Sequence, residues 1–239
     1  MDGPVAPPGY RTEPVSFTRR GGRLTERQQQ AWDDASSHYV LDIPRFGPST
    51  SVDPTWTFDP VATFGREAPL VVEIGCGRGE VLAHAARTNP DLDFLGLEVY
   101  VPGVAQTIVA LQDDDTRNAR LAIVNAAEAL STMFVTGSVH ELWMFFPDPW
   151  HKKRHHKRRL VTPAFAPLAA RVLRPGGVWR FATDWDDYVR QAEDVLAAAP
   201  GFVDGGRVER FEGRVLTRFE RKGLEAGRTI TDLAAVREA

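Results

Sequence analysis

The sequence predicts an α/β fold: a mostly parallel sheet with helices on both faces and an antiparallel hairpin at its C-terminal edge. From Leu70 onward, strand-like segments alternate with helix-length segments, and the strand-like segments are largely apolar. Apolar strands of this kind are buried on both faces, as in parallel sheets covered by helices. The hairpin is predicted from segments 202–211 and 214–221, which both have strand-like patterns, with Glu212-Gly213 between them suited to a turn.

The expected elements follow in a regular order. LVVEIG forms the first strand, and DFLGLEV, RLAIVNA, SVHELWMFF and GVWRFATD form the next four. The helical segments between and after them are 80–87, 101–111, 163–173 and 185–199. The third helix stops at Arg-Pro-Gly-Gly, since proline and glycine do not continue a helix.

The first part of the chain has a different composition and is predicted to be an extension. Residues 1–65 are rich in Pro, Arg, Gln and Ser, and we expect them to be partly flexible. One helix is expected there, because Thr25-Glu26-Arg27-Gln28 resembles a capping box. Residues 66–239 then form the main domain.

Composition excludes several classes of protein. The chain has 239 residues, of which 43% are hydrophobic and 26% charged, which is typical of a globular domain and not of a disordered chain. Its single cysteine, Cys76, excludes an intrachain disulfide and fits a reducing compartment. The sequence has no long apolar run and no signal-peptide pattern, so we expect a soluble cytoplasmic protein without membrane contact. Because the net charge is -3, a polyanionic partner must meet a local basic patch.

The segment VVEIGCGRGE predicts a nucleotide-binding turn after the first strand. Gly75, Gly77 and Gly79 let the backbone approach a ligand at the head of the next helix. Glu98 ends the second strand, where a carboxylate can accept both hydroxyls of an adenosine ribose. The glycine spacing is GxGxG, and Glu73 stands just before the turn. An acid there favours a ligand with a cationic end, such as S-adenosylmethionine, over a dinucleotide.

The most informative segment is FFPDPWHKKRHHKRRL. Two prolines hold Asp148 at the end of the fourth strand, which is the edge where open parallel sheets bind ligands. Asp148 could hold a base for methyl transfer, or it could simply cap the next segment. After Trp150 come six fixed positive charges without an acid, which indicates a phosphate-tracking patch: Lys152, Lys153, Arg154, Lys157, Arg158 and Arg159. The interleaved histidines have no usual ligand spacing, so we expect no metal.

Two further polar residues stand at strand ends, and each has two interpretations. Asn125 follows the third strand and could bond to adenine or cap a helix. Asp184 follows the fifth strand and could face a cleft together with Asp148, where two carboxylates would accept the donors of a guanine edge. Asp184 could instead cap the helix that begins near Trp185.

Taken together, these motifs resemble the bacterial tRNA (guanine-N(7)-)-methyltransferases, the TrmB family. The resemblance covers Val71 to about Leu233 and rests on EIGCGRG, GLEVY, FFPDPWHKKRHHKRRL, ATDW and TRFERKG, in that order. It implies a Rossmann-like class I methyltransferase domain with a seven-stranded sheet. It also implies S-adenosyl-L-methionine as the methyl donor and N(7) of a guanine in the variable loop of tRNA as the acceptor.

The resemblance also assigns roles to residues, motif by motif. It implies that Asp148 is the catalytic residue and also contacts the cofactor. The other cofactor-binding residues implied are Glu73, Gly75, Glu98 and Asn125, although some members appear to carry Asp where this chain has Asn125. The implied tRNA-binding residues are Lys152, Asp184, Thr217, Arg218, Phe219 and Glu220. We expect the extension, residues 1–65 with Arg19 and Arg20, to contact the same tRNA.

Other functions remain as alternatives. A class I methyltransferase acting on another RNA or a small molecule would share the glycine turn, but a small-molecule enzyme does not need the basic segment. A non-enzymatic RNA-binding protein would keep the basic segment without a cofactor pocket. A dehydrogenase is disfavoured by the glycine spacing and Glu73. The sequence is compatible with either a monomer or a homodimer.

Overall fold

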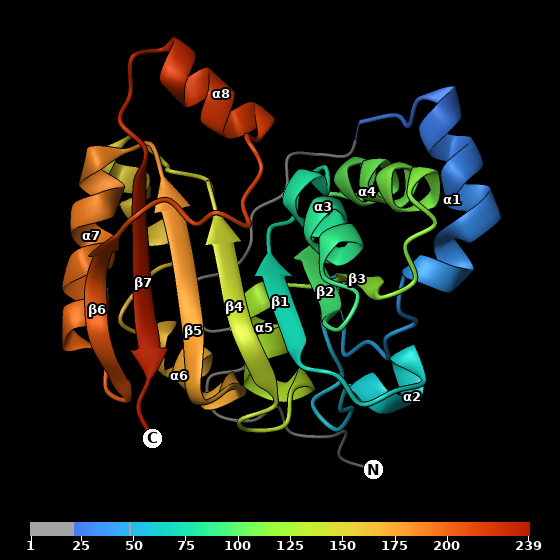
Figure 1. Ribbon diagram of the computed structural model, residues 1–239, viewed down its shortest axis with the longest axis horizontal. Coiled ribbons are helices and arrows are strands. Elements are labelled where there is room, and N and C mark those ends of the chain that lie inside the picture. Colours follow the sequence, from blue (N-terminus) through green and yellow to red (C-terminus); the bar gives the residue numbers. More distant parts are fainter. Residues whose placement is uncertain (1–21, 48) are drawn as a thin grey trace.

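The computed structural model describes residues 22–47 and 49–239, and within them seven strands form one sheet in the order β3-β2-β1-β4-β5-β7-β6. The first five strands run parallel: β1 (Leu70–Ile74), β2 (Asp93–Glu98), β3 (Ala119–Ile123), β4 (Val139–Phe145) and β5 (Leu173–Thr183). β7 (Thr231–Arg237) lies antiparallel between β5 and β6 (Phe202–Val208). Figure 1 shows the parallel strands ending together along the upper edge of the sheet. The predicted α/β class is confirmed.

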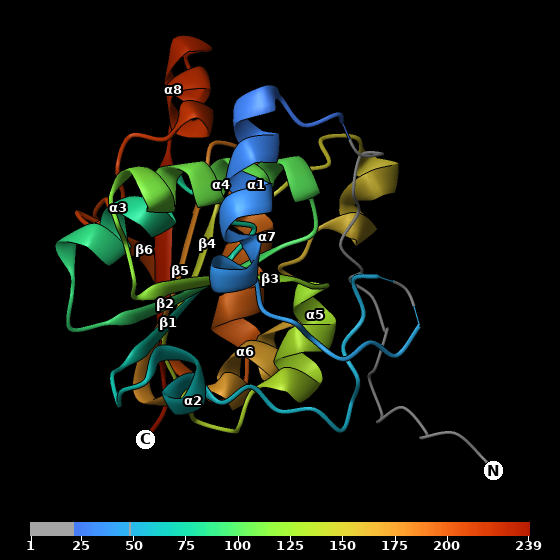
Figure 2. The same ribbon diagram turned by 90° about the vertical axis from the view of Figure 1, so that its right-hand side faces the viewer.

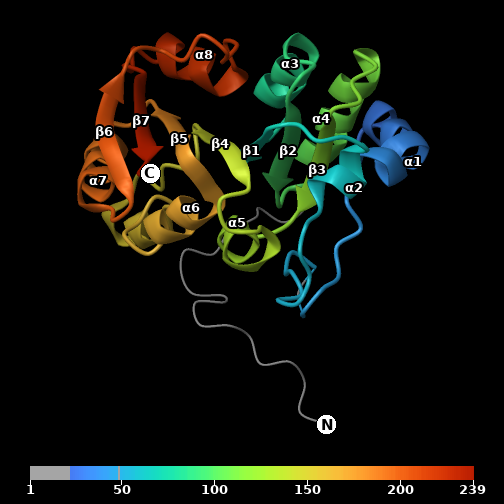
Figure 3. The same cartoon turned by 60° about the horizontal axis from the view of Figure 1, so that its bottom comes forward.

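Helices cover both faces of the sheet, as predicted (Figure 3). One face carries α3 (Glu80–Thr88) and α4 (Val101–Asp113), and the other carries α5 (Ala126–Glu128), α6 (Ala166–Val172) and α7 (Asp186–Ala198). Side chains alternate along β1 between two hydrophobic cores: Leu70 and Val72 pack with α5, α6 and α7, and Val71 packs with α3 and α4. Both faces are therefore buried, which explains the apolar strand sequences.

The predicted C-terminal hairpin is only half right. β6 forms within 202–211, but the segment 214–221 is not its partner strand, since it contains a loop and the start of α8 (Arg218–Glu225). The Thr217 hydroxyl accepts a hydrogen bond from the Glu220 N–H at 3.1 Å and so begins the helix. Thr-x-x-Glu is a helix-start pattern, and the strand-like alternation of the neighbouring residues concealed it. The true partner of β6 is β7.

The described part of the N-terminal extension is packed against the domain. α1 (Glu26–Tyr39) begins at the predicted capping box, in which Thr25 and Gln28 bond to each other's backbone. Figure 2 shows α1 crossing α4, and Gln28 donates a hydrogen bond to the Pro102 carbonyl at 3.2 Å. The short helix α2 (Pro60–Phe64) precedes β1. Residues 1–21, including Arg19 and Arg20 of the predicted RNA-binding extension, lie outside the described residues.

Gly103 in α4 packs directly against the glycine turn that follows β1. A Cβ built on Gly103 would lie 2.4 Å from the Gly77 carbonyl oxygen, so the two backbones touch. The Thr107 hydroxyl, one turn further along α4, donates to the Gly103 carbonyl at 3.1 Å. Glycine at this position lets α4 approach the turn closely.

We expect Gly103→Ala to lower thermal stability, because the added methyl group must displace backbone atoms. Overpacking of this kind costs about 1–3 kcal/mol, which corresponds to a fall of several degrees in Tm. Gly206→Ala is the matched control, since a Cβ there meets no atom within 4 Å. Thermal unfolding followed by circular dichroism measures both variants, and equal Tm values for the two would contradict the contact.

Candidate active site

A cavity of about 450 Å³ opens at the carboxyl ends of β1, β2 and β4. That edge is where parallel α/β sheets bind ligands, and the volume suits a small organic molecule. Its walls come from the ends of these strands, the segment after β4 and the first turn of α8. The lining residues are Ile74, Gly75, Gly77, Leu97, Glu98, Val99, Tyr100, Val124, Ala126, Phe146, Pro147, Asp148, Trp150, Arg158, Leu160 and Phe219.

Gly75 and Gly77 of the glycine turn line this cavity, whereas Gly79 does not. Gly75, Gly77 and Gly79 all have positive φ angles of 71°, 58° and 76°, which side chains other than glycine rarely adopt. A Cβ on Gly75 would meet no atom within 4 Å, because that side of the backbone is open. A Cβ on Gly79 would lie 2.4 Å from Thr107 in α4. The glycines therefore have different uses: Gly75 exposes backbone to a ligand, and Gly79 allows α3 to pack on α4.

Glu98 is held rigidly at the cavity wall. Its Oε2 accepts a hydrogen bond from Gly77 N–H at 2.9 Å, and its Oε1 accepts from Val99 and Tyr100 N–H at 2.7 and 2.9 Å. Burial raises the pKa of Glu98, although these three donors favour the charged form. The side chain thus ties the end of β2 to the glycine turn and forms part of the cavity wall.

Glu73 lies one layer below the cavity and does not line it. Its side chain is only 4% exposed, and among the described residues its Oε2 has no hydrogen-bond partner. Burial, with a further contribution from the nearby charge of Glu98, raises the pKa of Glu73 to about 8. A buried acid without a compensating donor is costly when ionised. It is also well suited to a cationic ligand group brought near the turn.

The structure places Asn125 as a helix cap. Its side-chain oxygen accepts hydrogen bonds from Ala127 and Glu128 N–H at 3.0 and 3.3 Å, and the side chain is buried. Its neighbours Val124 and Ala126 line the cavity, whereas Asn125 does not. Of the two interpretations that the sequence left open, the cap is the one observed, and Asn125 shapes the cavity wall through its neighbours.

Asp148 lies on the cavity wall with an exposed carboxylate. Phe146 and Trp150, which flank it, have φ angles of 52° and 44°, and such left-handed conformations cost about 1–2 kcal/mol each. The Pro149 carbonyl accepts a hydrogen bond from Arg159 Nε at 2.8 Å. Because surrounding contacts hold this unfavourable backbone, Asp148 is presented in one place, as strained residues at functional sites often are.

The basic segment beside Asp148 divides into two groups. Lys152, Lys153, Arg154 and Lys157 are exposed, as a phosphate-binding surface requires. Arg159 is 1% exposed and points inward, where it pairs with Asp187 at 2.7 Å. The sixth cation, Arg158, lines the cavity, and its guanidinium lies 4.9 Å from the centre of the Trp150 ring. The short 3-10 helix at Lys153–Arg158 sets this division.

Figure 1 shows α8 above the carboxyl ends of the strands, and its first turn contributes to the cavity wall. Phe219 is 56% exposed and lines the cavity, and Arg218 is exposed, with its backbone N–H bonded to Glu80 at 3.1 Å. Thr217 and Glu220 are buried: Thr217 caps the helix, and Glu220 pairs with Arg210 and Arg214. The structure thus brings Arg218 and Phe219 to the surface and keeps their two neighbours inside.

Asp184 is also engaged within the protein. Its Oδ2 accepts a hydrogen bond from Arg228 Nε at 2.7 Å, and a Cβ on Gly223 would lie 2.7 Å from the same oxygen. Asp184 therefore docks α8 onto the end of β5. It does not line the cavity with Asp148. It is not the cap of α7 either, because the N-cap is Trp185, without a side-chain hydrogen bond.

Two aromatic residues that the sequence did not single out also line the cavity. Tyr100 follows Glu98 in GLEVY, and Phe146 precedes Pro147 in FFPDP. Phe146 directly follows β4, and Tyr100 comes two residues after the end of β2. An aromatic residue next to the end of a parallel strand was the available signal. Within the described residues no group of His, Cys, Asp or Glu could hold a metal ion, and no helix is long and apolar enough to cross a membrane.

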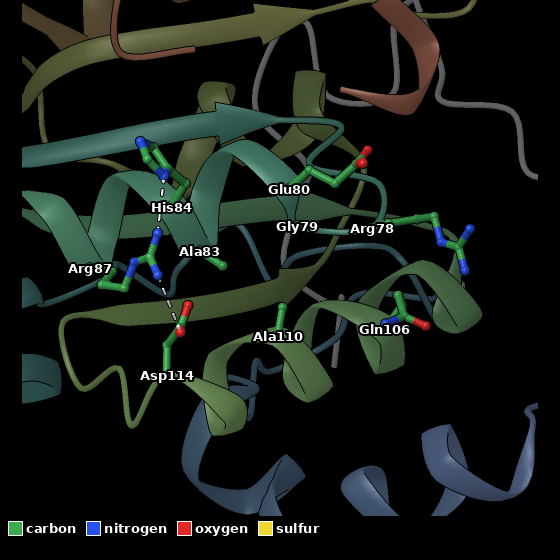
Figure 4. Close-up of a pocket in the computed structure, with 9 residues that line it drawn as sticks. All are labelled: Arg78, Gly79, Glu80, Ala83, His84, Arg87, Gln106, Ala110 and Asp114. Atoms are coloured by element: carbon green, nitrogen blue, oxygen red, sulfur yellow. Dashed lines mark hydrogen bonds and ion pairs between the residues drawn. The ribbon is translucent and has the colours of Figure 1, made fainter. Parts of the chain in front are cut away.

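A second cavity, of about 390 Å³, lies between α3 and α4 (Figure 4). Arg87 crosses it to pair with Asp114 at 3.6 Å, and His84 lies 3.4 Å from the same guanidinium. Neither Asp148 nor Glu98 lines it. The first cavity is therefore the candidate active site.

Comparisons with known proteins agree with this assignment. A family model described as "Putative methyltransferase" matches residues 67–233. A tRNA (guanine-N(7)-)-methyltransferase from Arthrobacter sp. (strain FB24) is 44% identical and covers 94% of this chain and 86% of its own. One from Cutibacterium acnes is 50% identical over 92% of this chain and 81% of its own. The chain belongs to the tRNA (guanine-N(7)-)-methyltransferase family.

Solved structures outside this family share its fold. The 16S rRNA methyltransferase KamB superposes with a TM-score of 0.54 at 19% identity, covering 74% of this chain and 94% of its own. A 16S rRNA (adenine(1408)-N(1))-methyltransferase from Catenulisporales acidiphilia has a TM-score of 0.53 at 17% identity, covering 80% and 93%. These similarities confirm the Rossmann-like methyltransferase fold of this family member.

The raised pKa of Glu73 predicts a pH-dependent gain in stability for Glu73→Gln. Below about pH 4.5 the acid is neutral in both the folded and the unfolded chain, so the variant has no advantage. As the pH rises to about 8, only the unfolded chain ionises freely, and the wild type is progressively destabilised relative to the variant. We expect the Tm of Glu73→Gln to exceed that of the wild type by several degrees at pH 8.

Thermal unfolding of the ligand-free protein from pH 5 to pH 8 measures this effect. Glu67→Gln is the control, because Glu67 is exposed and its substitution removes the same charge. A Tm difference between Glu73→Gln and the wild type that stays constant across this range would contradict the assignment.

Proposed function

We propose that this protein transfers a methyl group from S-adenosyl-L-methionine to N(7) of a guanine in the variable loop of tRNA. The observation that carries the proposal is the cavity between Glu98 and Asp148, which opens beside the exposed cations of the basic segment. Family membership supports the same reaction. We also propose that the protein acts in the cytoplasm, as a monomer or a homodimer, where a free thiol such as Cys76 stays reduced.

The residues around the cavity fit S-adenosylmethionine. The open side of Gly75 gives a ligand access to the backbone, and the fixed carboxylate of Glu98 can accept hydrogen bonds from ribose hydroxyls. Glu73, buried below the turn, favours a cationic group near Gly75. Asn125 contributes by holding Val124 and Ala126 in the wall. When bound, the cofactor supplies an electrophilic methyl group on a positively charged sulfur.

Asp148 is proposed as the catalytic residue because its carboxylate stands where cofactor and base would meet. N(7) of guanine has an in-plane lone pair, so no proton has to be removed before it is methylated. The main task of the protein is to hold the base in line, which oriented side chains do effectively. Asp148 can accept a hydrogen bond from the base. The base can also stack on the aromatic rings of Tyr100, Trp150 and Phe219, which line the cavity.

The tRNA backbone is proposed to bind along two basic rims of the cavity. Lys152 and its exposed neighbours in 152–157 form one rim, and Arg218 on α8 begins the other. Phosphate contacts of this kind provide most of the sequence-independent affinity for RNA. Thr217, Glu220 and Asp184 contribute to the second rim by fixing α8 in place. The net charge of -3 does not oppose this arrangement, because the cations are gathered at the cavity.

The decisive experiment is transfer of a labelled methyl group to unmodified tRNA, followed by mapping of the methylated guanine. Methylation of N(7) in the variable loop supports the proposal. Labelling of a different RNA position, of small metabolites only, or of nothing overturns it.

We expect Asp148→Ala to lose at least about 99% of tRNA methylation, because removing an orienting group commonly costs on the order of 10²-fold in rate. The dissociation constant for S-adenosylmethionine should change only a few-fold, since Glu98 and the glycine turn remain. Methyl transfer assays and calorimetry measure the two effects. Asp194→Ala, an exposed acid on α7, is the control and should behave as the wild type. Near wild-type turnover by Asp148→Ala would exclude the catalytic role.

We expect Lys152→Ala/Lys153→Ala to weaken tRNA binding and to flatten its salt dependence. Each lost phosphate contact lowers the slope of log K against log salt by about 0.7–0.9. Arg117→Ala/Arg174→Ala removes the same charge from the opposite edge of the sheet and should leave the slope unchanged. Fluorescence anisotropy with labelled tRNA at several salt concentrations measures both double variants, and identical slopes would argue against the rim.

A further inference from the structure

We propose that Arg214 is a positioning residue that holds α8 and the Asp148 segment at a set distance across the mouth of the cavity. The inference rests on the proposed function, because it assigns Arg214 a part in placing the tRNA substrate. Arg214 lies in the loop between β6 and α8 and does not itself line the cavity. Its effect on the reaction is therefore exerted through other residues.

On one side, Arg214 is bound to α8 and to the sheet at the same time. Its side chain is 1% exposed, and its guanidinium pairs with Glu220 at 3.1 Å and with Asp232 at 2.9 Å, with a further short contact from Nη1 to Asp232. Glu220 belongs to the first turn of α8, and Asp232 belongs to β7. The planar guanidinium bridges both carboxylates, which a lysine ammonium cannot do in the same way.

On the other side, Arg214 contacts the end of β4. Its guanidinium carbon lies 5.3 Å from the ring centre of Phe145 and 5.4 Å from that of Phe146. Cation–π contacts at these distances are stabilising, more so when buried. Phe146 has the left-handed φ of 52° and stands two residues before Asp148. Arg214 therefore supports the strained backbone from which Asp148 is presented.

The two sides meet at the cavity, because both Phe146 and Phe219 line it. Phe219 precedes Glu220 in α8, so the ion pair that holds Glu220 also places the Phe219 ring. A buried ion-pair cluster is weak evidence for stability alone, since apolar residues of similar volume often stabilise as well or better. What such a cluster does provide is a defined distance and orientation between the elements that it joins. Here it sets the distance between Phe146 and Phe219, the two sides of the cavity between which a base would enter.

Arg214→Lys tests the proposal, with Arg210→Lys as the matched control. Arg210 pairs with the same Glu220, but its side chain is 44% exposed, and its other hydrogen bond goes to the Phe211 carbonyl instead of to Asp232. We expect Arg214→Lys to lower kcat/KM for tRNA about tenfold or more. The dissociation constant of Arg214→Lys for S-adenosylmethionine should stay within about threefold of the wild-type value. For Arg210→Lys, both kcat/KM and this dissociation constant should stay within about twofold of wild type.

A double-mutant cycle with Phe219→Leu separates positioning from general destabilisation. If Arg214 acts by placing Phe219, the double variant Arg214→Lys/Phe219→Leu loses little more kcat/KM than the more affected single variant. The effects of Arg210→Lys and Phe219→Leu on the activation free energy should instead be additive. The proposal is overturned if Arg214→Lys retains wild-type kcat/KM, if the two losses multiply, or if cofactor affinity falls in parallel with turnover.

Hydrogen exchange provides a measurement that does not depend on the substrate. At a temperature well below the Tm, Arg214→Lys should raise the hydrogen-exchange rates of α8 and of residues 146–150 together. Arg210→Lys should not raise the exchange rates of the two segments together. Changes confined to one segment would contradict the coupling. If the wild type fails to methylate tRNA while this exchange pattern is found, the proposed function fails and the link through Arg214 stands.

Discussion

The parallel pairing of β1 with β2 and β4 is the constraint on which the site depends. In this register Ile74 lies beside Leu97, and Glu73 lies beside both Gly96 and Trp143. Because parallel strands end at the same edge, the glycine turn, Glu98 and the segment carrying Asp148 emerge side by side although they are far apart in the sequence. The antiparallel β7 lies between β5 and the edge strand β6 and returns the chain from α8. The site therefore follows from the order of the strands.

Glu98 lines the cavity and Glu73 is buried next to it, whereas most cations of the basic segment are exposed beside the cavity. Burial raises the pKa of both Glu73 and Glu98, which means that the folded chain alone does not fully accommodate their negative charge. A ligand carrying positive charge relieves this cost. Outside the cavity, the exposed cations of 152–157 are suited to a polyanion. A cationic methyl donor and an anionic acceptor molecule are thus favoured at adjacent places on one surface.

Buried arginines organise both walls of this cavity. Arg159 binds the Pro149 carbonyl and Asp187, and its guanidinium lies 4.7 Å from the ring centre of Tyr188, so it anchors the segment after Asp148 to α7. Arg214 anchors α8 in a comparable way. In the sequence both residues look like members of a basic surface, since a one-dimensional pattern of charge does not reveal which side chains turn inward. Each also has a carboxylate partner on a distant element, Asp232 at 18 positions from Arg214 and Asp187 at 28 positions from Arg159.

The sequence by itself determined the α/β class, the succession of the first five strands along the chain, the capping box of α1 and the family, because these depend on local apolar patterning and on short motifs. It also located Glu98 and Asp148, since strand ends in a parallel sheet meet at one edge. Only the tertiary structure decided that 214–221 leads into a helix, that Asn125 caps α5, and that Asp184, Glu220 and Arg159 are engaged within the protein. The physical reason is that a polar side chain can satisfy its hydrogen bonds with solvent, ligand or protein, and only packing selects among these partners.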